Sequence, residues 1–308
     1  MVSQTSYTGL ITRFSSGFYT VELESETLEC KTRGRLKRGR AQGDIISLGD
    51  RVEVLKLSDG TGVIESVKER KSVLARMDPR PRGEYQQVFL ANPDQVVIVF
   101  ACTQPEPRMK MLDRFLVIAE KNGIIPLIVA NKVDLMPMDE AQKMFSIYQD
   151  IGYEVLFTSA NARIGLDALH TALTGRISAL AGPSGVGKSS LLNAIQPHLG
   201  LNVRAVSQTT SKGKHTTVVR QLFKLNTGGY VADLPGLKSL AIWDIEPEEV
   251  DGYFPDLRDL VPDCRFSDCS HQKEPGCAVL DALEKGELFQ ERYESYLRIR
   301  FGDEEDEI

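Results

Sequence analysis

The sequence predicts a multidomain protein: a small N-terminal β-barrel, a central α/β domain and a mainly helical C-terminal domain. Three observations predict this fold class. Residues 5–69 hold short strand-like segments separated by turns, residues 88–243 alternate strand-length and helix-length segments, and three of the five cysteines cluster after residue 260. We therefore expect a barrel at residues 1–72, a linker at 73–87, the α/β domain at 88–243 and the C-terminal domain at 244–308.

The composition is that of an ordinary globular protein, since 42% of the 308 residues are apolar and 26% are charged. No apolar segment approaches the roughly 20 residues that span a bilayer, and the N-terminus lacks a secretion-signal pattern. We expect a cytoplasmic protein with no membrane partner, and a monomer. The odd number of cysteines, five, argues against a disulfide framework.

Charge is distributed unevenly along the chain. Residues 244–308 carry 20 acidic and 7 basic side chains, so the net charge of −6 conceals a basic front part. Residues 31–40 hold six basic side chains and no acidic one. This segment suits a phosphate backbone, but it is equally consistent with a solvated loop.

The N-terminal domain contains four segments with β character, at residues 7–11, 18–23, 50–55 and 62–67. Their spacing favours a barrel of the oligonucleotide-binding (OB) type that binds RNA, although a small sandwich or an SH3-like barrel would give a similar pattern. The basic stretch at residues 68–82 predicts an irregular linker, because Pro79 and Pro81 interrupt regular structure.

The central domain alternates predicted strands with predicted helices, which indicates a mostly parallel sheet covered on both faces. Strands are expected at residues 95–101, 126–130, 155–158, 177–181 and 230–232, and helices at 109–121, 139–152, 165–173 and 189–195. Asp139 is the expected N-cap of the second helix. Ligands of such sheets bind at the carboxyl ends of the strands.

A phosphate-binding loop follows the strand at residues 177–181. It matches G-x-x-x-x-G-K-[ST] and opens a helix, the context that this motif requires. Backbone N–H groups and the helix N-terminus favour bound phosphate, Lys188 reaches the β- and γ-phosphates, and Ser189 can hold Mg²⁺. The expected phosphate-binding residues are Gly182, Pro183, Ser184, Gly185, Val186, Gly187, Lys188, Ser189 and Ser190.

Two further motifs indicate that the nucleotide is a guanine nucleotide. Asn131, Lys132 and Asp134 form N-K-x-D at a strand end, where the Asp134 carboxylate can accept hydrogen bonds from N1 and N2 of guanine. Ser159 and Ala160 follow the next strand and are expected behind the base. GTP or GDP is therefore the expected ligand.

The remaining nucleotide contacts are expected after the phosphate loop. Residues 200–217 are typical of a mobile polar loop, and either Thr216 or Thr217 can complete Mg²⁺ coordination with Ser189. Asp233 and Gly236 form D-x-x-G, which supplies an acid to the Mg²⁺ shell and an N–H to the γ-phosphate.

The motif order is permuted, because N-K-x-D precedes the phosphate loop. The pieces can still meet in space, which predicts a circularly permuted P-loop GTPase domain. Leu237 follows Gly236 and cannot orient water, so intrinsic hydrolysis should be slow. His215 and Lys188 are the candidate catalytic residues, and a structural role for His215 is as plausible as a catalytic one.

The C-terminal domain contains Cys264, Cys269, His271 and Cys277, the complete ligand set of a structural zinc site. The spacing is not the usual C-x2-C, and reduced buried thiols are the alternative. An acidic tail follows at residues 302–308.

Together these motifs resemble the RsgA family, GTPases that depend on the small ribosomal subunit. The resemblance is carried by residues 91–95, N-K-x-D at 131–134, the phosphate loop at 182–189, residues 213–217, D-x-x-G at 233–236 and the four expected zinc ligands. The resemblance implies an OB fold that binds ribosomal RNA (rRNA), a hydrolytic role for His215, and a partner in the maturing small ribosomal subunit. A GTP-gated RNA-binding module with incidental hydrolysis remains the alternative.

Overall fold

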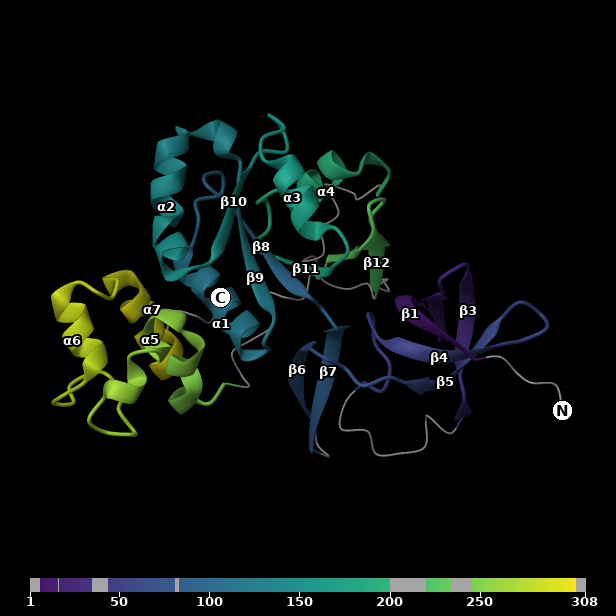
Figure 1. Cartoon of the computed structure of the whole chain (residues 1–308), viewed down its shortest axis with the longest axis horizontal. Helices are drawn as coiled ribbons and strands as arrows, with labels where there is room; N and C mark the ends of the chain where they lie inside the picture. Colours follow the sequence, from purple (N-terminus) through teal and green to yellow (C-terminus); the bar gives the residue numbers. More distant parts are fainter. Residues whose placement is uncertain are drawn as a thin grey trace.

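The computed structural model describes residues 6–15, 17–34, 44–80, 83–199, 220–233 and 245–302. The barrel and the helical C-terminal domain lie at opposite ends of the molecule, with the α/β domain between them (Figure 1). Part of the basic segment (residues 35–40), the polar loop (200–217) and most of the acidic tail (303–308) lie outside the described residues.

The N-terminal domain is a five-stranded barrel. Its strands are β1 (Ser6–Ser15), β2 (Phe18–Glu22), β3 (Thr27–Thr32), β4 (Arg51–Lys56) and β5 (Gly62–Val67). They run in the order β1-β2-β3-β5-β4, and β4 pairs with β1 to close the barrel. The closed five-stranded barrel is OB-like, as expected, and excludes a two-sheet sandwich. The strand β3 was not identified in the sequence analysis.

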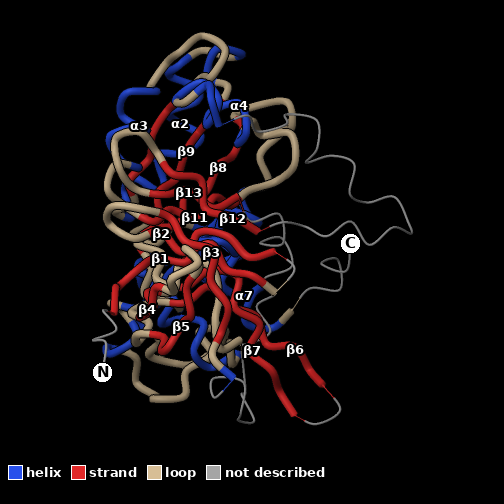
Figure 2. Tube along the Cα trace, turned by 90° about the vertical axis from the view of Figure 1, so that its right-hand side faces the viewer, coloured by secondary structure: helices blue, strands red, loops and turns tan. Residues whose placement is uncertain are grey.

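The expectation of irregular structure at residues 68–82 was wrong for residues 73–80. They belong to an antiparallel hairpin of β6 (Val73–Arg80) and β7 (Gly83–Ala91), which forms a two-stranded sheet of its own (Figure 2). Pro79 pairs with Glu84 in this hairpin. A proline is tolerated because each strand of an isolated pair has a free edge that needs no N–H donor.

The central domain contains a six-stranded part of the sheet in the order β10-β9-β8-β11-β13-β12. Its strands are β8 (Gln95–Ala101), β9 (Ile125–Asn131), β10 (Glu154–Thr158), β11 (Ile177–Ala181), β12 (Arg220–Lys224) and β13 (Tyr230–Asp233). All neighbouring pairs are parallel except β12 and β13. The expected mostly parallel sheet is confirmed.

Helices cover both faces of this sheet. On one face α1 (Met109–Lys121) and α2 (Met138–Ile151) pack against β8 and β9, and on the other face α3 (Leu166–Leu173) and α4 (Lys188–Ile195) do so. The cap of α2 is Pro137, not the expected Asp139. Asp139 lies instead in the first turn, where its negative charge stabilises the helix by interacting with the positive end of the helix dipole.

Main-chain contacts join the barrel to the central domain. β12 pairs with β1, with Arg13 opposite Gln221, so both domains share one 11-stranded sheet. The Asn92 side chain donates to the Gly49 carbonyl at 3.0 Å and accepts from the Lys71 N–H at 2.8 Å. Gly49 has φ +81° and lies close to Ala91. A Cβ added at Gly49 would be 2.0 Å from the carbonyl oxygen of Ala91.

The C-terminal domain is mainly helical, as expected. It contains η7 (Pro247–Tyr253), α5 (Pro255–Arg258), η8 (Val261–Asp263), α6 (Ala278–Lys285) and α7 (Gln290–Phe301), where η denotes a 3-10 helix. Val117 of α1 is buried together with Val250 and Phe254 of this domain.

A buried charge cluster completes the contact between the C-terminal and central domains. The Arg292 side chain of α7 is 1% exposed, and its Nη1 donates to Asp113 of α1 at 2.5 Å. Its Nε and Nη2 donate to Asp256 of α5 at 3.1 and 2.9 Å. Asp113 also accepts hydrogen bonds from Tyr148 of α2 and from Ser295. The Arg292 guanidinium and the two carboxylates are therefore largely desolvated and paired with one another.

In the described part of the chain, no helix has the length and apolar character needed to cross a membrane.

Candidate functional site

The phosphate loop connects β11 in the centre of the sheet to the first turn of α4. It requires glycine at both ends for steric reasons. Gly182 has φ +131°, and an added Cβ would lie 2.1 Å from the Val99 carbonyl oxygen; Gly187 has φ +98°, and an added Cβ would lie 2.4 Å from Asn131 Nδ2. Only glycine fits both the left-handed backbone and the close neighbours.

The charged groups of this site lie around the loop. Lys188 is buried, and its Nζ donates to the carbonyl oxygens of Gly182 and Pro183 at 2.8 and 2.7 Å. Asp233 ends β13 directly beside Leu180 of β11. Burial raises the pKa of the Asp233 carboxyl group, and the Lys188 ammonium opposes that shift. The loop thus has a cation and a carboxylic acid at its side, next to the buried Ser189.

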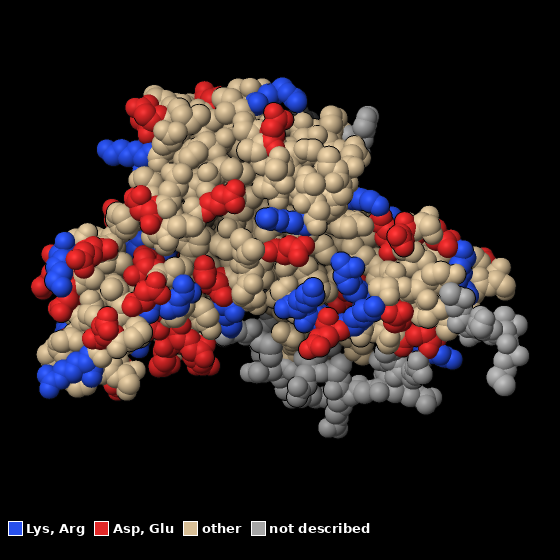
Figure 3. Space-filling model, viewed as in Figure 1, with Lys and Arg blue, Asp and Glu red and all other residues tan. Residues whose placement is uncertain are grey.

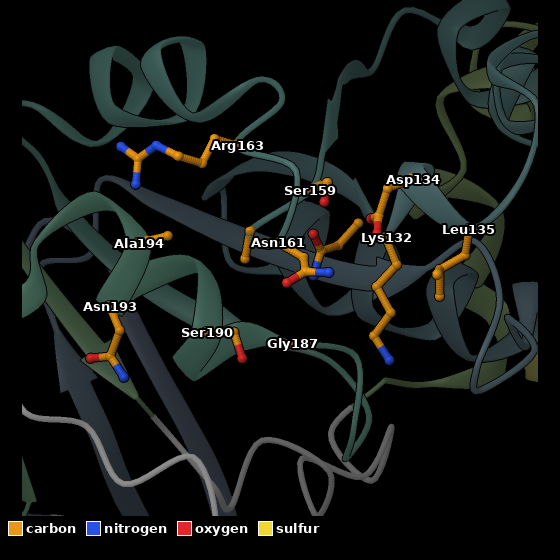
Figure 4. Close-up of a pocket in the computed structure, with 12 residues that line it drawn as sticks. Lys132, Asp134, Leu135, Ser159, Asn161, Arg163, Gly187, Ser190, Asn193 and Ala194 are labelled. Atoms are coloured by element: carbon orange, nitrogen blue, oxygen red, sulfur yellow. The ribbon is translucent and has the colours of Figure 1, made fainter.

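A pocket of about 600 Å³ opens beside the loop at the carboxyl ends of β9 and β10 (Figure 4). Seven of the predicted nucleotide-binding residues line it, namely Asn131, Lys132, Asp134, Ser159, Ala160, Gly187 and Ser190. They come from three segments that are far apart in the sequence. In Figure 4 the Lys132 and Asp134 side chains lie on one side of the pocket and Ser190 of α4 below it.

The Asn131 side chain forms hydrogen bonds to the phosphate loop and to the end of β10. Its Nδ2 donates to the Val186 carbonyl of the phosphate loop at 2.8 Å, and its Oδ1 accepts from the Thr158 hydroxyl at 3.1 Å. The Ser159 Oγ accepts from the Ala162 N–H at 2.9 Å, which holds the turn after β10. These contacts hold the carboxyl ends of β9 and β10 against the phosphate loop.

Sequence reasoning did not select several residues that line the pocket: Leu135, Asn161, Arg163, Asn193 and Ala194. Asn161 follows Ser159 and Ala160 directly, so its position in the motif could have identified it. Asn193 and Ala194 could have been found from helical spacing, because they lie one turn after Ser190 on the same side of α4. No sequence signal marks Arg163.

Four predicted site residues, His215, Thr216, Thr217 and Gly236, lie outside the described residues. The roles of the nucleotide-binding residues within the described part remain predictions, although their positions agree with one site.

The four predicted metal ligands converge in the C-terminal domain. The ligand atoms of Cys264, Cys269, His271 and Cys277 all lie within 4.8 Å of one another. His271 Nδ1 is 3.6 Å from Cys264 Sγ and 3.3 Å from Cys277 Sγ. In a tetrahedral zinc site with metal–sulfur bonds of about 2.3 Å, ligand atoms are roughly 3.5–4 Å apart. The donor set and its spacing therefore fit zinc.

Exposed aromatic side chains lie where β1 ends and β2 begins, on the two faces of this strand pair, because Phe14 is opposite Tyr19 and Phe18 is opposite Ser15. Phe14 and Phe18 are 44% and 42% exposed, and Phe14 lies 4.9 Å from Tyr19 between ring centres. Lys31 Nζ lies 4.8 Å from the Phe18 ring centre.

Figure 3 shows basic and acidic side chains interspersed on one face of the molecule, including over the C-terminal domain.

Two family models match the chain: the RsgA GTPase model over residues 67–243 and the RsgA N-terminal domain model over residues 8–64. A protein of Gemmatimonas aurantiaca named small ribosomal subunit biogenesis GTPase RsgA is 44% identical over 301 residues, which is 96% of this chain and 97% of that protein. The crystal structure of YjeQ from Thermotoga maritima is similar with a TM-score of 0.80 and 40% identity, over 97% of this chain and 100% of that one. The crystal structure of YloQ, described as a circularly permuted GTPase, gives a TM-score of 0.77 and 35% identity, over 98% of this chain and 96% of that one.

Proposed function

The chain belongs to the RsgA GTPase family. On that premise we propose that the small ribosomal subunit stimulates its hydrolysis of GTP to GDP and phosphate. We propose that it acts late in the maturation of that subunit. Membership of the family makes it a GTP hydrolase. The observation that carries the proposal is the pocket in which Asp134, Ser159 and Gly187 meet from separate chain segments.

The described residues suit the two ends of a guanine nucleotide. Asp134 reads the N1 and N2 donors of guanine, with Lys132 and Ala160 beside the base. An adenine base would leave the Asp134 carboxylate without its two donors, which costs binding free energy. The loop at residues 182–189 and the Lys188 ammonium stabilise the negative charge that is redistributed among the phosphate oxygens as water attacks the γ-phosphate in line.

Ser189 in the first turn of α4 and Asp233 at the end of β13 offer oxygen ligands of the kind that Mg²⁺ prefers. We propose that they hold Mg²⁺ together with Thr216 or Thr217. When bound, the ion neutralises charge on the β- and γ-phosphates. His215 is the proposed residue that orients the attacking water.

We also propose that the Cys264, Cys269, His271 and Cys277 site holds one structural zinc ion. All four tetrahedral positions are filled by the chain, which leaves no position for a catalytic water. Metal analysis of the purified protein should give one zinc per chain.

Ribosomal RNA is the proposed contact of the barrel. Exposed Phe18 offers a face on which a base can stack, and Lys31 lies beside it to contact phosphates. Substitution Phe18→Ala should weaken subunit binding by about 1–3 kcal/mol if a base stacks there. The protein is proposed to act as a cytoplasmic monomer.

The deciding experiment measures GTP turnover with and without purified small ribosomal subunits across a salt series. ATP is the substrate control, and the His215→Ala and Lys188→Ala variants are measured alongside. We expect subunits to raise turnover by orders of magnitude, and salt to abolish the effect steeply because counterions are released on RNA binding. Unchanged turnover with intact subunit binding would instead identify a GTP-gated binding module.

Guanine selection has its own test in Asp134→Asn. An amide offers a donor where guanine also offers a donor, so GTP affinity should fall by at least about 10²-fold. Xanthosine triphosphate, which has a carbonyl oxygen at that position, should bind the variant better than GTP does. Equal GTP affinity in the variant and the parent protein would remove Asp134 from the base site.

A further inference from the structure

The His271 imidazole has two different neighbours on its two nitrogen atoms. The ring is fully buried, and Nδ1 faces the sulfur atoms of Cys264 and Cys277. Nε2 lies 3.1 Å from Oδ2 of Asp251, a residue of η7. A nitrogen that coordinates a metal carries no proton. The ring proton of a neutral, metal-bound His271 is therefore on Nε2, where it donates to the Asp251 carboxylate.

Asp251 has a second charged neighbour at the same carboxylate oxygen. Arg300 of α7 is buried, and its Nη1 lies 3.5 Å from Asp251 Oδ2. The same Nη1 donates to the Tyr296 hydroxyl at 2.6 Å and to the carbonyl oxygen of Cys269 at 3.2 Å. Asp251 thus has a fixed position relative to two of the four ligands.

The His271 backbone also needs this support. Its φ is +57°, a left-handed conformation that is uncommon for a residue other than glycine. The Tyr293 hydroxyl donates to the His271 carbonyl at 2.7 Å. The ring orientation is therefore determined by one contact at the backbone and one at Nε2.

We propose that Asp251 is a positioning residue of the metal site: it selects the Nε2–H tautomer of His271 and orients Nδ1 toward the metal. This inference rests on the proposed zinc site. It gives η7 a role in metal binding that neither the Cys-His motif nor its spacing indicates, because Asp251 lies 20 residues before His271. Through η7 the metal site also contacts α1 of the central domain, since Val250 packs with Val117.

The test measures the zinc affinity of the full-length protein by competition with a chromophoric chelator. We expect Asp251→Ala to weaken zinc binding by about 10–100-fold, the usual effect of losing such a partner. Asp251→Asn should lose less, because its amide oxygen still accepts from Nε2–H. Glu249→Gln is the matched control, because Glu249 lies in the same element and its side chain accepts an exposed hydrogen bond from Tyr253. The zinc affinity of this variant should equal that of the parent protein.

Co²⁺ provides a second measurement on the same variants. Its absorption spectrum reports the ligand field of a tetrahedral site, so a misoriented His271 should change the spectrum of Asp251→Ala even at saturating Co²⁺. GDP affinity of each variant reports whether the central domain is intact. If the parent protein binds no zinc, the zinc assignment fails and this inference fails with it. If the parent protein binds zinc and Asp251→Ala binds it within twofold with an unchanged Co²⁺ spectrum, only the role of Asp251 is overturned.

Discussion

The barrel and the C-terminal domain are joined to the central domain by different chemistry. At the barrel, the contacts are main-chain hydrogen bonds between β1 and β12, an asparagine that bonds to backbone groups, and a glycine against a carbonyl. At the C-terminal domain, the central contact is the Arg292 guanidinium between two carboxylates. We refer to these as the main-chain joint and the ionic joint.

The difference lies in how each joint depends on single side chains. Backbone hydrogen bonds form with almost any side chain, so the main-chain joint depends on shape at a few positions. A buried ion pair gives little net stability, but the loss of one partner leaves an uncompensated charge. We therefore expect the ionic joint to be the more sensitive to substitution, and the following predictions test this order.

The largest effect is expected for Arg292→Ala. The substitution leaves Asp113 and Asp256 without their shared cation, and it should lower the free energy of unfolding by about 3–5 kcal/mol. Denaturant unfolding followed by circular dichroism measures the change. Arg258→Ala is the control, because the Arg258–Glu120 pair at 3.8 Å involves a half-exposed arginine and should contribute less than about 1 kcal/mol. Equal effects of the two substitutions would refute the ionic joint.

Gly49→Ala should come next. The left-handed backbone costs about 1–2 kcal/mol for alanine, and the overlap with the Ala91 carbonyl adds about 1–3 kcal/mol. Gly60→Ala separates the two contributions, because Gly60 has φ +84° and nothing within 4 Å of an added Cβ. The same unfolding experiment should show a clearly smaller loss for Gly60→Ala, and similar losses would mean that the close approach to Ala91 is unimportant.

A smaller loss is expected for Asn92→Gly. Glycine tolerates the φ of +54° at this position and removes both side-chain hydrogen bonds. At about 0.5–1.5 kcal/mol for each bond, the loss should be roughly 1–3 kcal/mol. Hydrogen exchange at the Lys71 amide offers a local measurement, and unchanged protection there would show that Asn92 does not hold the joint.

The smallest effect is expected for Lys224→Ala, which removes the exposed ion pair between β12 and Glu22 of β2. Such pairs contribute about 0–1 kcal/mol and weaken with salt. The unfolding midpoint should shift only slightly at low salt and not at all at high salt. A loss as large as that of Arg292→Ala would reverse the comparison between the two joints.

Much of the fold and most of the site could be predicted from the sequence, because both are encoded locally. The phosphate loop, N-K-x-D and the strand–helix alternation each lie within a few residues, and the structure places Asn131, Asp134 and Gly187 around one pocket. The four predicted metal ligands also lie within one short stretch of sequence, and the structure brings them together.

What could not be predicted depends on contacts between distant segments. Asp113 and Arg292 are 179 residues apart, and α7 has the charged composition of a solvated helix. The strand β12 is defined mainly by its pairing with β1 and β13. The hairpin of β6 and β7 was not predicted, because Pro79 by itself indicates irregular structure. A proline disrupts a strand only where its missing N–H group would have donated a hydrogen bond to a neighbouring strand.

The pairing of β1 with β12 also has a consequence for biosynthesis. The strands of the barrel are complete by Val67, whereas Gln221 is added more than 200 residues after its partner Arg13. At roughly 5–20 residues per second, translation leaves this end of β1 without its partner for about 10–40 s. During that interval the barrel has an open strand edge, which can pair with another nascent chain. A chaperone that shields such edges would therefore be most useful to this protein before its phosphate loop and β12 leave the ribosome.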